Sequence, residues 1–152
     1  MISLSKYRKI NVGMLGGGIN SSVGRCHVTA SRMDGKINII AGCFSRDEKI
    51  NKDTATYYQI EQKSCFETLE QMLEEMGNSI EAVIIATPID QHFEQINTIL
   101  EAGKIIICDK PLVSNIEQID NLRDRVDFKS NMIIPIYNYT AYPLVREMKS
   151  LI

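Results

Sequence analysis

The amino-acid sequence predicts an α/β fold in which a doubly wound, mostly parallel sheet is covered by helices on both faces. Three observations indicate this fold. An apolar run ends in three consecutive glycines, Gly16, Gly17 and Gly18, and opens directly into a helical pattern. Apolar runs and helical patterns then alternate five times along the chain. The runs at 81–88 and 104–108 are apolar almost without interruption, which is typical of strands buried in a parallel sheet.

Composition and charge exclude several classes of protein. The chain has 152 residues, of which 44% are hydrophobic and 24% charged, and its net charge is −2. This balance excludes a nucleic-acid-binding protein, because such a protein needs a basic face. No apolar run approaches the ~20 residues that span a bilayer, and residues 1–9 lack the apolar core of a signal peptide. We therefore expect a cytoplasmic globular protein that does not bind a membrane.

The cysteines do not indicate a metal site. Cys26, Cys43, Cys65 and Cys108 are widely spaced and form no C-x-x-C motif. Neither a zinc knuckle nor a disulfide framework follows from this spacing. We expect four reduced thiols and no bound metal.

The stretch 10–24 predicts a strand, a phosphate-binding turn and the start of a helix. Glycines let backbone N–H groups approach a pyrophosphate closely, and a helix N-terminus offers unpaired donors and a partial positive charge. The dinucleotide fingerprint G-x-G-x-x-G is met at Gly16 and Gly18 but has Ser21 in the third place, where a small residue lets the helix pack closely on the strand. The alternative is a surface loop without a ligand. The residues predicted to bind the cofactor here are Gly16, Gly17, Gly18, Ile19 and Asn20.

The rest of the chain continues the alternation. With the helix at about 21–33 and the strand at 36–44, the first strand forms a βαβ unit of about 35 residues. An amphipathic helix is expected at 65–76, and a capping box from Ser114 to Glu117 predicts the start of another helix. Together, the later elements are helices at 47–58, 65–76, 90–102, 114–126 and 142–152, and strands at 81–87, 104–108 and 131–137.

In an open parallel sheet, ligands bind beyond the carboxyl ends of the strands. This rule places several short segments on one rim and predicts that the chemistry of the protein lies there. The segments are Gly16–Gly18, Phe44–Arg46, Thr87-Pro88, Asp109–Pro111 and Asn138.

These segments resemble the N-terminal Rossmann domain of the Gfo/Idh/MocA oxidoreductases, the family of glucose–fructose oxidoreductase and inositol dehydrogenase. Four motifs carry the resemblance, in order and over nearly the whole chain. They are Gly13-Met-Leu-Gly-Gly-Gly18 followed by Gly24 and His27, Ala86-Thr87-Pro88 followed by His92, Asp109-Lys110-Pro111-Leu112, and Asn138-Tyr139-Thr140 followed by Pro143.

The resemblance implies hydride transfer between NAD(P) and a hydroxyl of a sugar, inositol or related polyol. It implies that Lys110 is catalytic and lies near the nicotinamide and the substrate hydroxyl, where its ammonium stabilises a developing alkoxide. By the same analogy the Lys110–Pro111 bond is cis, and Thr87, Pro88, His92 and Asn138 bind the cofactor. His27 is expected to be a packed helix residue without chemistry. From the sequence alone, a partly exposed residue at a helix start is an equal alternative for His92.

The end of the second strand indicates the cofactor. An acid at this position accepts hydrogen bonds from the ribose 2′-hydroxyl of NAD, whereas an arginine accommodates the 2′-phosphate of NADP. Here Ser45 and Arg46 occupy the position, and no carboxylate occurs before Asp47. We therefore predict binding through Ser45 and Arg46, with NADP favoured over NAD.

The resemblance also predicts the domain organisation. Residues 1–130 form the dinucleotide-binding domain, and residues 131–152 hold the last strand and the start of a helix that crosses to a substrate domain. That second domain, with the Asp-x-x-x-His segment that supplies the acid/base histidine in the family, is absent, so we expect a truncated, isolated nucleotide-binding domain that is inactive alone. The aromatic stretch 137–142 is then exposed, which favours a homo-oligomer. The alternative function is a non-catalytic dinucleotide-binding sensor or regulatory module.

Overall fold

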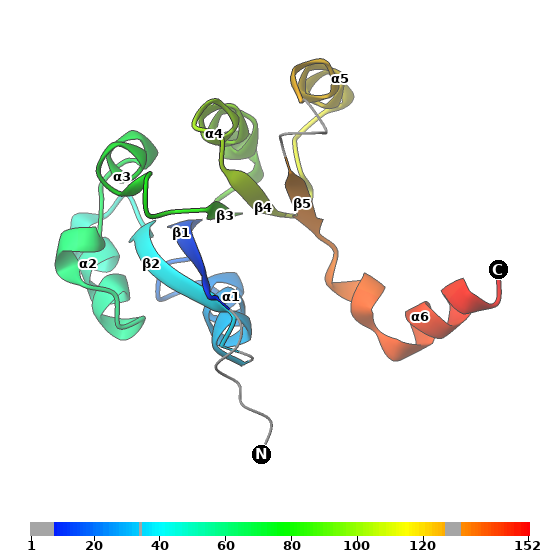
Figure 1. The fold of residues 1–152 in the computed structure, drawn as a ribbon, viewed down its shortest axis with the longest axis horizontal. Coiled ribbons are helices and arrows are strands. Elements are labelled where there is room, and N and C mark those ends of the chain that lie inside the picture. Colours follow the sequence, from blue (N-terminus) through cyan, green and yellow to red (C-terminus); the bar gives the residue numbers. More distant parts are fainter. Residues whose placement is uncertain (1–7, 34, 127–131) are drawn as a thin grey trace.

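A five-stranded parallel sheet forms the centre of the protein (Figure 1). This computed structural model describes residues 8–33, 35–126 and 132–152. The strands follow the order β2-β1-β3-β4-β5, and every neighbouring pair is parallel. The sheet therefore confirms the predicted doubly wound fold. Its strands are β1 (Ile10–Gly16), β2 (Ile37–Cys43), β3 (Ala82–Ala86), β4 (Ile105–Asp109) and β5 (Ile133–Ile136).

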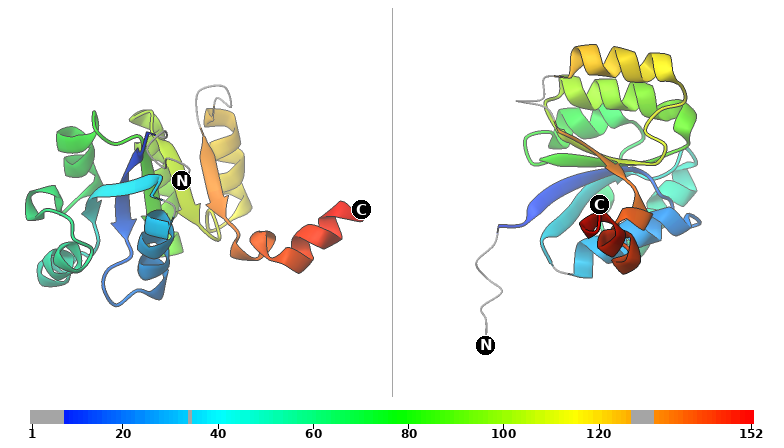
Figure 2. Two further views of the ribbon diagram at one scale, coloured as in Figure 1. Left: turned by 60° about the horizontal axis from the view of Figure 1, so that its bottom comes forward. Right: turned by 90° about the vertical axis from the view of Figure 1, so that its right-hand side faces the viewer.

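Helices cover both faces of the sheet. Figures 1 and 2 show α3, α4 and α5 side by side on one face of the sheet. They show α1 on the other face, and α2 beside the edge formed by β2. No helix in the described ranges is both long enough and apolar enough to cross a membrane. The helices are α1 (Ser22–Met33), α2 (Glu48–Tyr57), α3 (Leu69–Met76), α4 (Ile89–Glu101), α5 (Ile116–Arg125) and α6 (Pro143–Ser150), with 3-10 turns η2 (Gln62–Ser64) and η3 (Asn138–Ala141).

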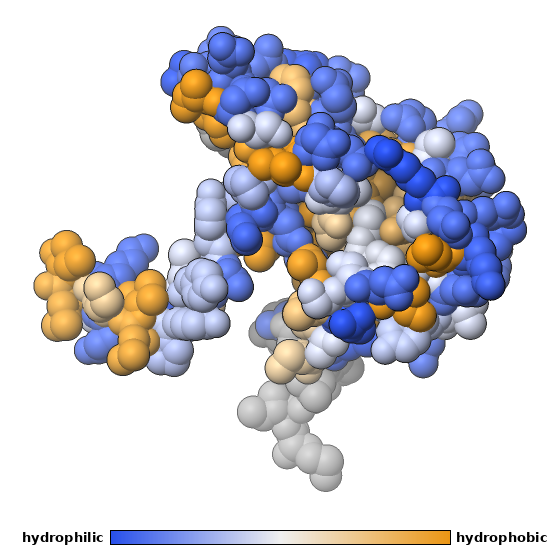
Figure 3. Space-filling model, turned by 180° about the vertical axis from the view of Figure 1, so that it is seen from behind, coloured by the Kyte–Doolittle hydropathy of each residue, from blue (hydrophilic) through white to orange (hydrophobic). Residues whose placement is uncertain are grey.

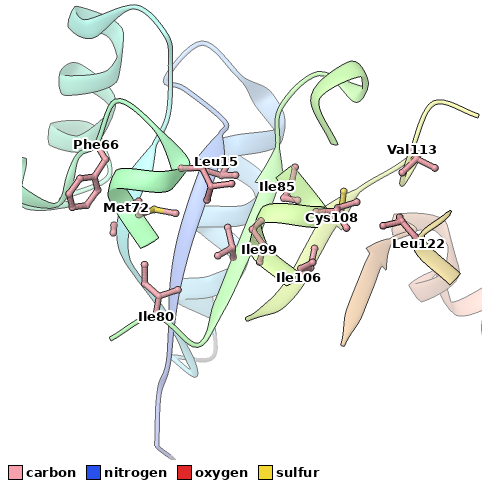
Figure 4. Close-up of a cluster of buried hydrophobic side chains, with 14 residues drawn as sticks. Leu15, Phe66, Met72, Ile80, Ile85, Ile99, Ile106, Cys108, Val113 and Leu122 are labelled. Atoms are coloured by element: carbon pink, nitrogen blue, oxygen red, sulfur yellow. The ribbon is translucent and has the colours of Figure 1, made fainter. Parts of the chain in front are cut away.

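Apolar clusters lie on both sides of the sheet. In β3, Val83 and Ile85 belong to the cluster under α3, α4 and α5, whereas Ala82 and Ile84 belong to the cluster under α1 and α2. Figure 4 shows the first cluster, in which Ile85 lies close to Ile99 of α4. Because successive strand residues point to opposite faces, a strand buried on both faces must be apolar throughout. This explains the uninterrupted apolar run.

The helix predicted to begin at residue 65 begins four residues later, at Leu69. Cys65 instead forms a parallel bridge with Gly42, and the Phe66 N–H donates to the Gly42 carbonyl. Thr68 then caps α3 by accepting a hydrogen bond from the Gln71 N–H. The local helical period was misleading here because β2 holds the first residues of the stretch in an extended conformation.

The capping box predicted from Ser114 to Glu117 is also wrong, by one residue. Asn115 is the N-cap of α5, and its side-chain oxygen accepts from the Gln118 N–H at 3.0 Å. In return the Gln118 side chain accepts from the Ser114 N–H at 2.9 Å. The arrangement resembles a capping box with Asn and Gln in place of Ser and Glu, except that Gln118 accepts from the residue before the N-cap rather than from the N-cap itself.

Some predicted features lie outside the described residues. The turn residue Asp34, the N-terminal residues 1–7, residue 131 of the last predicted strand and the domain boundary between 130 and 131 are among them. The described part of the last strand, Ile133–Ile136, pairs with β4 as an edge strand.

Candidate functional site

The glycine turn joins β1 to α1 at the carboxyl edge of the sheet. Gly16 and Gly17 have φ angles of 69° and 67°, in the left-handed region that favours glycine. A Cβ on Gly16 would lie 2.5 Å from the Ala86 carbonyl oxygen in β3, and one on Gly17 would lie 2.3 Å from the Met14 side chain. Only glycine fits at either position. The backbone is thus held tightly against the sheet at the point where a ligand can approach it.

The glycine that allows α1 to pack closely on this turn is Gly24. A Cβ on Gly24 would lie 2.0 Å from the Gly17 carbonyl oxygen, so the two backbones are in direct contact. The interpretation of Ser21 as the third, close-packing residue of the fingerprint is therefore wrong. Ser21 acts as the N-cap of α1 instead, because its hydroxyl accepts from the Gly24 N–H at 3.2 Å.

Helix α2 holds the glycine turn from the side. The Thr54 hydroxyl accepts from the Ile19 N–H at 2.9 Å, and the Tyr58 hydroxyl donates to the Gly17 carbonyl at 2.8 Å. Asn51, one turn earlier, accepts from the Phe44 N–H at 2.7 Å at the end of β2. None of these three residues was predicted from the sequence. Their signal was polar side chains at i, i+3 and i+7 of a helix, a spacing that places them on one face.

The turn retains backbone donors for an anion. The Ile19 N–H is donated to Thr54, so this predicted cofactor residue does not offer its backbone donor to a ligand. Among the described residues, no acceptor is present for the Gly18 and Asn20 N–H groups. Arg25 adds a positive charge, with its guanidinium donating to the Ile19 carbonyl at 2.9 Å. A phosphate at the start of α1 would therefore meet free donors and a cation.

A cavity of about 500 Å³ opens beside the turn. Its size suits part of a dinucleotide, because small-molecule sites range from about 300 to 1,000 Å³. Five of the predicted cofactor-binding residues line it, namely Gly16, Ser45, Arg46, Thr87 and Pro88. The remaining lining residues are Leu15, Cys43, Phe44, Glu67, Thr68, Leu69, Glu70, Gln91, Glu94, Gln95 and Thr98.

Arg46 lies just beyond the end of β2, and the neighbouring acid in the chain, Asp47, does not pair with it. Asp47 is engaged as the N-cap of α2, accepting from the Ile50 N–H at 2.8 Å. Arg46 is exposed and has no hydrogen bond or ion pair with another described residue. The acids of the cavity, Glu67, Glu70 and Glu94, come from the α3 and α4 side.

Burial keeps the thiols near the rim protonated at neutral pH. Burial raises the pKa of Cys43 to about 12, and its thiol donates to the Thr68 carbonyl at 2.9 Å. Burial also raises the pKa of Cys108 to about 12, with a smaller contribution from Asp109. Within the described ranges, no group of three or more His, Cys, Asp or Glu residues is placed to hold a metal ion.

Lys110 follows the last residue of β4 and is exposed at the same edge of the sheet. The Lys110–Pro111 peptide bond is cis, which confirms the expectation. The Lys110 ammonium has no hydrogen bond or ion pair with another described side chain. The preceding Asp109 is paired, because its carboxylate lies 2.9 Å from Nε2 of His27 in α1. His27, to which the sequence analysis assigned no chemistry, thus contacts the predicted catalytic turn.

His92 lies beneath the rim. Its side chain is only 2% exposed, so the alternative of a partly exposed histidine is wrong. Its Nε2 lies 2.9 Å from the Thr87 carbonyl oxygen, and its Nδ1 lies 3.1 Å from the Pro111 carbonyl oxygen. The ring therefore joins the turn after β3 to the turn after β4.

Apart from His92, which is buried beneath the rim, the predicted residues fall into two groups. The first group surrounds the glycine turn and the cavity at the ends of β1, β2 and β3. The second group, at the ends of β4 and β5, consists of Lys110 and of Asn138, the first residue of η3, which is exposed. Neither Lys110 nor Asn138 lines the cavity.

Comparison with known proteins identifies the family. Residues 10–137 match Gfo/Idh/MocA, described as an oxidoreductase family with an NAD-binding Rossmann fold. The chain is 29% identical over 143 residues to the uncharacterized oxidoreductase YfiI of Bacillus subtilis (strain 168), a match that covers 91% of the chain and 36% of YfiI. It is 28% identical over 144 residues to scyllo-inositol 2-dehydrogenase (NADP(+)) IolW of the same organism, covering 91% of the chain and 37% of IolW.

A solved structure agrees with this assignment. The inositol dehydrogenase homolog of Azotobacter vinelandii, complexed with NAD+, has a TM-score of 0.90 and 28% sequence identity to this protein. The match covers 99% of this chain and 40% of that one, so the chain spans less than half the length of these relatives. The chain belongs to the Gfo/Idh/MocA oxidoreductase family and carries its NAD-binding Rossmann domain.

Proposed function

We propose that this chain binds NADP or NAD at the rim of the sheet and is the cofactor-binding part of a dehydrogenase acting on a sugar, inositol or related polyol. The observation that carries the proposal is the turn at Gly16–Asn20, where close backbone packing adjoins a cavity and the Gly18 and Asn20 N–H groups have no acceptor among the described residues. Inositol is named in the descriptions of IolW and of the Azotobacter vinelandii homolog, which supports the substrate class.

The residues present suit such a cofactor. Backbone donors at Gly18 and Asn20, together with Arg25, would hold the pyrophosphate, and the cavity beside Ser45 and Arg46 would take the adenosine half. A bound nicotinamide would supply the hydride acceptor or donor. Lys110, at the far end of the rim, would hold its ammonium beside the substrate hydroxyl and stabilise the oxygen as its proton leaves.

Binding is the first test. Calorimetric titration of the 152-residue chain with NADPH, NADH and ADP-ribose should give dissociation constants well below about 1 mM, the weak limit for a specific site. The same ligands should raise the melting temperature, because they bind only the folded state. The absence of heat and of thermal stabilisation for all three ligands would refute the proposal.

We propose further that NADP is preferred. Arg46 is unpaired among the described residues and Asp47 is engaged in capping α2, so a 2′-phosphate would meet a cation rather than an acid of this segment. Arg46→Gln should weaken NADPH binding about tenfold, as expected for a charged hydrogen bond, and leave NADH binding unchanged. Tighter binding of NADH than of NADPH by the unaltered chain would overturn the preference.

The 152-residue chain alone should bind the cofactor without turnover, because positioning a polyol against the nicotinamide requires a substrate pocket as well. Polyol-dependent reduction of NADP by this chain would contradict that expectation.

The alternative function, a sensor module, is distinguished by the DNA after codon 152. Continuation into an Asp-x-x-x-His segment supports the enzyme.

A further inference from the structure

Both histidines of the sequence contact the two neighbours of Lys110. The chain contains two histidines in all. His27 Nε2 lies 2.9 Å from the carboxylate of Asp109, the residue before Lys110, and His92 Nδ1 lies 3.1 Å from the carbonyl oxygen of Pro111, the residue after it. We propose that His27 and His92 are positioning residues that hold Lys110 in place for the nicotinamide end of the cofactor. This inference rests on the proposed function.

The two histidines approach the turn from opposite faces of the sheet. His27 belongs to α1 and His92 to α4, and these helices lie on opposite sides of β4 (Figure 1). The His27 and Asp109 side chains are only 15% and 20% exposed, so little water competes for their contact of 2.9 Å. The turn therefore cannot shift toward either face without breaking a largely buried contact.

His27 also determines what Asp109 can contact. An ion pair between Lys110 and the neighbouring Asp109 would hold the ammonium away from a ligand. The contact with His27 occupies the Asp109 carboxylate, and Lys110 has no partner among the described residues. The ammonium thus stays available at the rim.

His92 secures the other side through the backbone. Its ring spans the carbonyls of Thr87 and Pro111 and lies 3.4 Å from the Cys108 thiol. The Cys108 sulfur is itself 3.4 Å from the Asp109 carbonyl oxygen. Lysine has a long and flexible side chain, so the placement of its ammonium depends on the backbone from which it starts, and this packed group determines that backbone.

Two ligands separate positioning of Lys110 from general stabilisation of the fold. NADPH carries the nicotinamide, whereas ADP-ribose keeps the adenosine, the pyrophosphate and the second ribose but lacks the nicotinamide. His27→Leu and His92→Leu should each weaken NADPH binding about fivefold, the loss expected for one hydrogen bond, and change ADP-ribose binding less than about twofold. His27→Gln, which keeps an N–H donor, should restore NADPH binding.

The Lys110→Met background supplies the decisive comparison. If the histidines act through Lys110, His27→Leu adds no further loss of NADPH affinity in this background. An equal loss for both ligands, or the same loss with and without Lys110, would assign the histidines a purely structural role and overturn the inference.

A measurement without ligand separates failure of this inference from failure of the proposed function. Amide hydrogen exchange over residues 109–113 should accelerate in His27→Leu and His92→Leu but not in His27→Gln, while residues 16–20 exchange as before. Unchanged exchange over 109–113 would overturn the inference. Failure of the unaltered chain to bind ADP-ribose would instead refute the proposed function.

Discussion

A methyl group added at Gly24 would prevent α1 from packing against the glycine turn. A Cβ there would lie 2.0 Å from the Gly17 carbonyl oxygen, and both partners are backbone, which cannot rotate away. We expect Gly24→Ala to lower the free energy of unfolding by about 3 kcal/mol, the upper range for overpacking. Gly103→Ala is the matched control, because Gly103 has a φ of 67° but no atom within 4 Å of an added Cβ. It should cost only about 1 kcal/mol. Urea unfolding of both variants measures the difference, and equal costs would contradict the close approach.

Cys108 makes stability depend on pH in the alkaline range. Its pKa is raised from 9.0 to about 12 in the folded protein, chiefly by burial. Above about pH 9 the unfolded chain loses this proton while the folded chain keeps it, so the free energy of unfolding falls as pH rises, by up to about 1.4 kcal/mol per pH unit. Because the pKa of Cys43 is raised in the same way, Cys108→Ala should reduce but not abolish the slope measured by urea unfolding between about pH 8 and 10.5. Cys26→Ala, at an exposed thiol, is the control. A slope that Cys108→Ala leaves unchanged would refute the buried thiol's contribution.

At the scale of the element, α2 covers part of the sheet and also holds the glycine turn through hydrogen bonds. Thr54 is completely buried and holds the Ile19 N–H, whereas Thr56 on the same helix is exposed and its hydroxyl donates to the Lys52 carbonyl. Thr54→Val keeps the shape of the side chain but leaves the Ile19 N–H unpaired. We expect it to weaken ADP-ribose binding about fivefold, and Thr56→Val to have no effect, by calorimetry. Equal affinities in the two variants would show that the hydrogen bond from the Ile19 N–H to Thr54 does not matter for binding.

The elements were predictable from local patterns, and their contacts were not. Periodicity and turn residues located every strand and helix to within a few residues, because burial on one face or both leaves a period in the sequence. The start of α3 was wrong because Cys65 pairs with Gly42, a contact with no local signal. The contact between His27 and Asp109 joins residues 82 positions apart, and the role of Gly24 depends on how a helix meets a turn. The rim was predictable from topology alone, whereas the residues that brace it required the structure.

At the scale of the whole molecule, the chain divides into a packed α/β body and a projecting end. Every residue from Tyr137 to Ile152 is exposed, and Figure 3 shows the apolar surface of α6 set apart from the body. Leu144 and Leu151 are 80% and 79% exposed. Since α6 buries little apolar surface, it contributes little to the folding free energy.

Removal of α6 tests this division. A chain ending at Tyr142 should melt within about 2 °C of the 152-residue chain, because the sheet and its two apolar clusters are intact. The same removal should reduce self-association, since exposed apolar side chains on α6 are the surface that a second copy would cover. Sedimentation velocity over a range of concentrations, compared between the two chains, measures this. A chain ending at residue 132, which lacks the β5 ladder with β4, is the destabilised control. A large fall in melting temperature on removing α6 alone would mean that this helix packs on the body in solution, and unchanged self-association would point to the tyrosines at 137–142 instead.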